Sequence, residues 1–128
     1  MFGLLSLEIV MAIHVRSLRE HGGADGVREA GLIQSAMASA ENAAFYGGGD
    51  VYDVAAAYAF HIAESQAFID GNKRTGIGAA MVFLAQNIAM GAISISDQDA
   101  LYAAMIAIAK HELDKAGFAA LLRRLFAQ

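Results

Sequence analysis

Apolar residues recur at helical spacing along almost the whole chain, and no proline interrupts them. An apolar stripe that repeats every three or four residues is typical of an amphipathic α-helix, and no segment shows a convincing strand pattern. Alanine, the commonest residue, adds the highest intrinsic helix propensity. The sequence therefore predicts an all-α fold. Its 128 residues carry no internal repeat or linker, which predicts a single domain over residues 1–128.

Six helices are predicted from the apolar stripes and from local boundary signals. Ser6 is the expected N-cap of the first helix and Asp53 that of the third. Ser96-Asp97-Gln98-Asp99 has the form of a capping box and opens the fifth. Glycine-rich loops are expected at 21–26 and 46–50. The predicted helices cover residues 7–20, 29–44, 54–66, 72–90, 96–110 and 113–126.

Charge and composition exclude several classes of protein. Nine basic and 13 acidic side chains give a net charge of −4, so the chain lacks the basic face that a direct nucleic-acid partner would require. Without cysteine there are no disulfides and no thiolate metal sites. The apolar stretch 76–95 is interrupted by Gln86 and Asn87, and it is predicted as a core helix plus a turn rather than a membrane span. With no export signal recognised, a cytoplasmic protein is expected.

The segment from Gln66 to Thr75, QAFIDGNKRT, carries the strongest chemical signal. It turns at a glycine and leads directly into the fourth helix, whose first N–H groups lie at the positive end of the helix dipole and suit an anion. Lys73 and Arg74 are unfavourable in this first turn unless something negative compensates them. A phosphate would do so, with Asp70 as a further anion or as a ligand of Mg²⁺. Alternatively, Asp70 caps the helix and both cations face solvent.

Other phosphate-binding motifs are absent. No segment has the spacing of a P-loop, and Gly76-Ile77-Gly78 lacks the third glycine and the preceding strand of a dinucleotide fingerprint. These two glycines are predicted to allow close helix packing instead.

The same segment resembles the Fic/Doc signature H-x-F-x-[DE]-[GA]-N-[KG]-R, in the form found in death-on-curing (Doc) toxins. Segments 26–36 and 55–62 are similar to other helices of the family, so the likeness covers nearly the whole chain. The resemblance implies a six-helix bundle with a phosphate-binding loop at the N-terminus of a long fourth helix. It also implies a toxin that uses ATP or another nucleoside triphosphate, with Mg²⁺, to phosphorylate elongation factor Tu and block translation.

The resemblance assigns roles position by position. Phe68 would anchor the loop in the core, and Asp70 would coordinate Mg²⁺. Lys73 stands where AMP-transferring relatives have glycine, which favours a kinase-like activity over AMP transfer. The phosphates would be held by four consecutive residues, Gly71, Asn72, Lys73 and Arg74.

One position departs from the family pattern. The catalytic histidine, which takes the proton from the target hydroxyl, is replaced by Gln66, and an amide cannot accept a proton near neutral pH. Catalysis is therefore expected to be impaired. Three explanations stay open: natural decay or conversion to a binding protein, an inactivating substitution, or chemistry that uses another base or none. His14 and His61 are predicted as buried structural histidines, and His21 and His111 as surface or helix-end residues. The alternative function is a non-catalytic pseudoenzyme that binds an antitoxin or a nucleotide.

Two surfaces are expected to receive partners. The loop 45–52 resembles the flap against which the family's target segment docks, although a plain connection explains its glycines equally well. The resemblance also implies an antitoxin of the prevent-host-death type. Its C-terminal helix is expected in a groove of Met, Phe and Leu side chains near the first helix and the flap.

Overall fold

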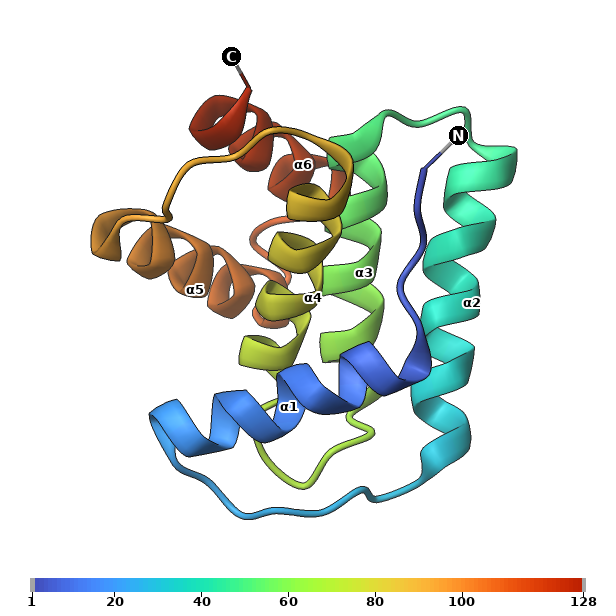
Figure 1. Cartoon of the computed structure of the whole chain (residues 1–128), viewed down its shortest axis with the longest axis vertical. Helices are drawn as coiled ribbons and strands as arrows, with labels where there is room; N and C mark the ends of the chain where they lie inside the picture. The colour runs from blue at the N-terminus through green and yellow to red at the C-terminus, as the bar shows by residue number, and fades with distance from the viewer. Residues whose placement is uncertain (1, 128) are drawn as a thin grey trace.

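The computed structural model describes residues 2–127, and this part of the chain forms six α-helices and no extended sheet. The predicted all-α fold is confirmed. Figure 1 shows α3 at the centre of the molecule, with α2 on one side, α4 and α6 on the other, and α1 crossing the end where α4 begins. The helices are α1 (Leu7–His21), α2 (Ala30–Tyr46), α3 (Val51–Ser65), α4 (Asn72–Asn87), α5 (Ile95–Ala109) and α6 (Lys115–Phe126).

The central helix α3 is buried on most of its surface, and alanine makes this possible. Five of its eight buried residues are alanines, so neighbouring helices approach its backbone closely. At Gly76 in α4, an added Cβ would lie 2.6 Å from the carbonyl oxygen of Ala59. At Gly78 it would lie 2.5 Å from the side chain of Ile13 in α1. The predicted role of these glycines in helix packing is confirmed.

Tyr58 connects α3 to two other parts of the chain. Its ring is fully buried, and its hydroxyl accepts a hydrogen bond from the Leu5 N–H at 3.3 Å and donates one to Glu41 in α2 at 3.2 Å. Burial raises the pKa of Tyr58 to about 12, so the phenol stays protonated and keeps both contacts throughout the physiological range.

The start of α3 corrects one prediction. Its N-cap is Asp50 rather than Asp53, and the Asp50 carboxylate accepts hydrogen bonds from the N–H groups of Tyr52 and Asp53. Asp53 closes the capping box by accepting from the Asp50 N–H at 3.0 Å. Arg123 of α6 donates to both carboxylates at 2.8–3.0 Å and holds the pKa of Asp50 below its usual value. The cap therefore also attaches α6 to the start of α3.

Other boundaries shift by a few residues. Helix α5 begins earlier than predicted, because Ser94 rather than Ser96 accepts the N–H of Asp97. Helix α4 ends at Asn87 instead of residue 90, where the Asn87 side chain turns to the backbone of Gly3. In addition, α2 extends through residue 46, which was predicted as loop, and α6 starts two residues later than predicted.

None of the helices in residues 2–127 is both long enough and apolar enough to cross a membrane. The stretch 76–95 contains most of α4 followed by an irregular turn, as predicted.

The contact between α3 and α4 yields a stability prediction. Gly76→Ala should lower the free energy of unfolding by about 1–3 kcal/mol, because the new methyl group meets backbone that cannot move aside. Gly31→Ala is the matched control: it lies in α2 with open space around it, and should stabilise by about 0.5–1 kcal/mol. Urea denaturation followed by circular dichroism measures both. Equal effects of the two substitutions would contradict the packing argument.

Candidate active site

The motif loop, residues 66–71, connects α3 to α4 at the end of the bundle that α1 crosses (Figure 1). Its anchor is Phe68, whose ring is fully buried. The side-chain amide of Asn72 accepts the Phe68 N–H at 3.1 Å and donates to the Phe68 carbonyl at 3.0 Å. Both polar ends of this amide are therefore engaged by the loop.

His14 of α1 holds the same loop from the other side. Its ring stacks on that of Phe68, with centroids 3.7 Å apart and planes 13° apart. Its Nε2 lies 2.9 Å from the carbonyl oxygen of Asp70, so Nε2 carries the proton and donates it. The imidazole is almost fully buried. The prediction of a buried structural histidine is confirmed for His14.

The segment between α1 and α2 runs beside the loop and pairs with it. Arg28 N–H donates to the Ala67 carbonyl at 2.6 Å, and Ile69 N–H donates to the Gly26 carbonyl at 3.1 Å. The two hydrogen bonds flank a short antiparallel bridge between Val27 and residue 68. The loop is thus held by the side chains of Asn72 and His14 and by backbone hydrogen bonds to the segment between α1 and α2.

The predicted flap lies elsewhere. The loop 45–52 precedes α3, whereas the loop 66–71 follows it, and the 15 residues of α3 separate the two by about 22 Å. Figure 1 shows them at opposite ends of the helix. The structure therefore favours the alternative of a plain connection for loop 45–52, and residues 22–29 are the segment that borders the motif loop.

A cavity of about 410 Å³ opens at the N-terminus of α4. Its wall is formed by the end of α1, the motif loop, the first turn of α4 and Tyr102 of α5. The structure brings together all the site residues that the sequence predicted: Gln66, Asp70, Gly71, Asn72, Lys73 and Arg74.

The start of α4 offers backbone N–H groups to this cavity. Gly71 is the N-cap, in the left-handed conformation with φ 82°, and no side chain caps the helix. The Asp70 carboxylate accepts the Ala24 N–H at 2.8 Å instead, so Asp70 does not act as the cap. Lys73 follows in the first turn and lines the same cavity. Uncapped N–H groups beside a lysine at the positive end of the helix dipole form a suitable anion cradle.

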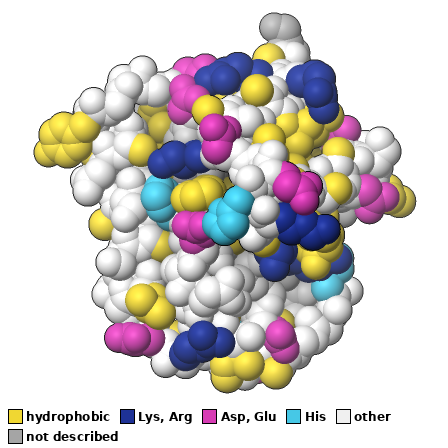
Figure 2. All heavy atoms as spheres, turned by 180° about the vertical axis from the view of Figure 1, so that it is seen from behind, with side chains coloured by type: hydrophobic (Ala, Val, Ile, Leu, Met, Phe, Trp, Pro, Cys, Tyr) yellow, Lys and Arg dark blue, Asp and Glu magenta, His cyan; other side chains and the backbone are white. Residues whose placement is uncertain are grey.

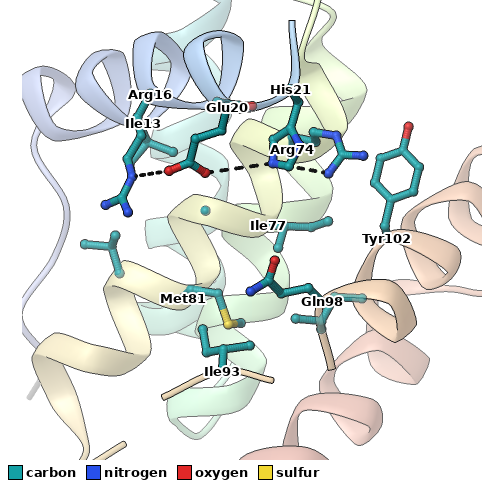
Figure 3. Close-up of a pocket in the computed structure, with 14 residues that line it drawn as sticks. Ile13, Arg16, Glu20, His21, Arg74, Ile77, Met81, Ile93, Gln98 and Tyr102 are labelled. Atoms are coloured by element: carbon teal, nitrogen blue, oxygen red, sulfur yellow. Dashed lines mark hydrogen bonds and ion pairs between the residues drawn. The ribbon is translucent and has the colours of Figure 1, made fainter. Parts of the chain in front are cut away.

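Arg74 is held by aromatic groups rather than extended into solvent. Its guanidinium carbon lies 4.2 Å from the centre of the Tyr102 ring, and its Nη1 lies 3.4 Å from Nε2 of His21. Figure 3 shows Arg74 between these two rings at the edge of a second hollow. The arginine is therefore positioned by α1 and α5 together.

Gln66 ends α3 in the left-handed conformation, with φ 52°. Its Nε2 donates to the Ala63 carbonyl at 3.2 Å, and the residue is part of the cavity lining. The amide can donate and accept hydrogen bonds there but cannot take up a proton near neutral pH.

Asp70 is the residue in this cavity that suits Mg²⁺. Its Oδ1 makes no hydrogen bond to the residues described, while Oδ2 is engaged by Ala24. Mg²⁺ is usually held by one or two carboxylates together with substrate phosphates. Within residues 2–127 no three His, Asp or Glu side chains cluster as a metal site. One carboxylate beside an anion cradle therefore fits a metal that arrives with a nucleotide.

His61 and His111 lie outside this cavity. His61 is half-buried on α3, its Nε2 accepts from Lys115 at 3.1 Å, and burial and Lys115 together lower its pKa. His111 is exposed at the turn between α5 and α6. Figure 2 shows histidines gathered with basic and acidic side chains on the rear face. The hydrogen-bonded role predicted for His61 is confirmed, although the residue is only half-buried.

The contribution of α1 to the cavity was not predicted from the sequence. His21 ends α1, as predicted, but its ring lines the cavity together with Ser17. Spacings of three and four residues place His14, Ser17 and His21 on one face of the helix. This polar stripe was the available signal that α1 borders the site.

Comparison with known proteins identifies the family to which the chain belongs. The sequence matches the Fic/DOC family over residues 4–84, which is more than half of the chain, and the chain therefore belongs to this family. It is also 27% identical over 123 residues to the protein kinase doc of Escherichia phage P1, covering 95% of this chain and 94% of that relative.

The two hydrogen bonds between the Asn72 amide and the Phe68 backbone form a clamp on the motif loop, and this clamp yields a second prediction. Asn72→Ala should lower the free energy of unfolding by about 1–3 kcal/mol, because it leaves a buried N–H and a buried carbonyl without partners. Asn42→Ala, on an exposed position of α2, is the control and should be neutral or slightly stabilising. Thermal unfolding of both variants measures the difference, and an unchanged Asn72→Ala variant would argue against the clamp.

Proposed function

We propose that the chain is a Doc-type toxin, a phosphotransferase that moves a phosphoryl group from ATP or another nucleoside triphosphate to a hydroxyl of elongation factor Tu. The observation that carries the proposal is the cavity at the start of α4, where an uncapped helix N-terminus, Lys73, Arg74 and Asp70 meet. The match to a protein kinase of the same family supports the reaction type. Blocking translation in this way would place the protein in the cytoplasm.

Each group in the cavity has a place in this chemistry. Phosphoryl transfer depends almost entirely on positioning and on neutralising the charge of the phosphates. The backbone N–H groups of Gly71, Asn72 and Lys73 would bind phosphate oxygens, and Arg74 would bind a further phosphate. Asp70 would hold Mg²⁺, which neutralises phosphate charge when bound.

Gln66 limits the rate in this proposal. General-base catalysis typically contributes about 10²–10⁴-fold, and the amide at this position cannot supply it. The phosphate-binding groups are otherwise in place, so the proposal is a binding-competent site with a slow chemical step. AMP transfer is the less favoured reaction, because Lys73 occupies the position of the glycine found in AMP-transferring relatives.

An antitoxin partner is proposed from the second hollow. It measures about 270 Å³ and lies between α1, α4 and α5, where Figure 3 shows Ile13, Ile77, Met81 and Ile93 around it. An apolar groove between helices suits the apolar face of a partner helix, here that of a prevent-host-death-type antitoxin. It borders α1, but not the loop 45–52, near which the groove was also expected. Its described lining contains Met and Leu, but isoleucines rather than phenylalanine.

This groove also favours a second candidate function. If the chain only binds its antitoxin, or binds nucleotide without turnover, it still needs the groove and the anion cradle. It needs no general base, so a glutamine at position 66 would not impair this function. A transfer assay with elongation factor Tu separates this pseudoenzyme from the slow toxin.

The phosphate-binding role of Arg74 can be measured apart from catalysis. Arg74→Ala should weaken binding of ATP with Mg²⁺ by about 1.5–3 kcal/mol, the usual contribution of a hydrogen bond between charged groups. Arg124→Ala, on the exposed end of α6, is the control and should leave the affinity unchanged. Isothermal calorimetry gives both values. Absence of nucleotide binding by the parent would refute the phosphate site.

Restoring a base at position 66 tests the proposed reaction. Gln66→His should raise transfer of labelled phosphate from ATP to elongation factor Tu by about 10²-fold or more, because the imidazole pKa lies near working pH. The gain should disappear when Asp70→Ala or Arg74→Ala is added. If Gln66→His transfers no phosphate while nucleotide still binds, the pseudoenzyme is the correct assignment.

A further inference from the structure

We propose that His21 is the proton acceptor that position 66 lacks, so that the parent chain keeps a slow phosphotransfer activity of its own. This inference rests on the proposed function and names a further residue of the same site. His21 is the last residue of α1, and its ring lines the cavity that also contains Gln66, Asp70 and Arg74. A histidine from another helix thus reaches the cavity in which the motif histidine is missing.

Nε2 of His21 has two charged neighbours, Arg74 and Glu20. Nη1 of Arg74 lies 3.4 Å from it, and a guanidinium can only donate, so Nε2 presents its lone pair. Oε2 of Glu20 lies 3.9 Å from the same nitrogen, close enough to stabilise an imidazolium once the proton has arrived. Figure 3 shows the imidazole between the carboxylate and the guanidinium.

The surrounding charges nearly balance. On α1, Arg16 binds Glu20 at 2.8 Å; from the loop and the first turn of α4, Asp70 and Lys73 line the cavity with Arg74. Tyr102 of α5 faces Arg74 from the other side. The imidazole therefore has charged side chains of both signs around it.

The other histidines do not meet these conditions. Nε2 of His14 is buried and donates to the Asp70 carbonyl, so it presents no lone pair there. His61 and His111 lie on α3 and at the α5–α6 turn, outside the cavity lining. Among residues 2–127, His21 is the imidazole that lines this cavity.

Ser17 borders the same cavity one turn before His21 on α1. The residue is more than nine-tenths buried, and its Oγ has no hydrogen-bond partner in the described structure. A buried hydroxyl without a partner is costly, so the end of α1 keeps an unsatisfied polar atom in the wall that carries His21.

The transfer of the phosphoryl group needs only His21, the nucleotide and the target hydroxyl. The target hydroxyl gives its proton to Nε2 of His21, and its oxygen forms a bond to the γ-phosphorus. The bond between this phosphorus and the bridging oxygen breaks, and the nucleoside diphosphate leaves with the electron pair. His21 then releases the proton to solvent. Phosphate binding by Arg74 would remove the guanidinium from Nε2 and expose the lone pair when nucleotide is present.

The test compares His21→Asn with His111→Asn in the parent chain. Transfer of labelled phosphate from ATP to elongation factor Tu should fall by about 10²-fold in His21→Asn and stay unchanged in His111→Asn. Calorimetry should show ATP affinity within about threefold of the parent in His21→Asn, since a base is not a phosphate ligand. Added imidazole should restore part of the rate in His21→Ala. In the Gln66→His background, the same His21→Asn change should cost less than about tenfold.

Three outcomes would overturn the role of His21. The first is a parent rate that survives His21→Asn. The second is a loss of rate matched by an equal loss of ATP affinity and no effect of imidazole, which would mean that His21 only positions Arg74. The third is a parent without transfer beside an active Gln66→His, which would leave the proposed function standing. If neither chain transfers phosphate, the proposed function itself fails.

Discussion

The backbone of Phe68 exchanges two hydrogen bonds with the side-chain amide of Asn72, and its ring stacks on His14. These contacts join the motif loop to α4 on one side and to α1 on the other. Because the Phe68 ring is fully buried, the loop cannot move without opening the core. Asp70 and the N-cap Gly71 follow directly, so their positions depend on this clamp. A rigid loop of this kind provides the fixed geometry that phosphate binding requires.

The clamp also explains why an unfavourable charge arrangement is tolerated. Lys73 and Arg74 stand in the first turn of α4, where cations are disfavoured and where no side chain caps the helix. The protein offsets part of this cost by stacking Arg74 on Tyr102. The rest remains as local positive potential beside the uncapped N–H groups. A site that binds anions is expected to keep such an imbalance, because a fully compensated helix end would have no affinity left for phosphate.

Local signals in the sequence were sufficient to predict the helices and the motif loop. They were insufficient where two caps competed or where a contact joins distant parts of the chain. Ser94 and Ser96 both begin an S-x-x-D pattern, and only the contacts of the folded chain select the first. Asp50 is the cap of α3 partly because Arg123, far along the chain, binds it. Loop 45–52 was compared with the flap by resemblance, although it precedes α3 while the motif loop follows it, so the helix between them already separates the two along the chain. The contact of His21 with Arg74 joins residues 53 positions apart, and no local pattern indicates such a pair.

The central claim is that the start of α4 binds the phosphates of a nucleotide and that α1 supplies the neighbouring wall. A crystal structure of the parent chain with Mg²⁺ and a non-hydrolysable ATP analogue measures this most directly. The account predicts phosphate oxygens within hydrogen-bond distance of the Gly71–Lys73 backbone and of Arg74, with Mg²⁺ bound to Asp70. It also predicts that the terminal phosphate lies on the side of the cavity that His21 lines. A nucleotide bound elsewhere, or with its phosphates turned away from the start of α4, would contradict the account.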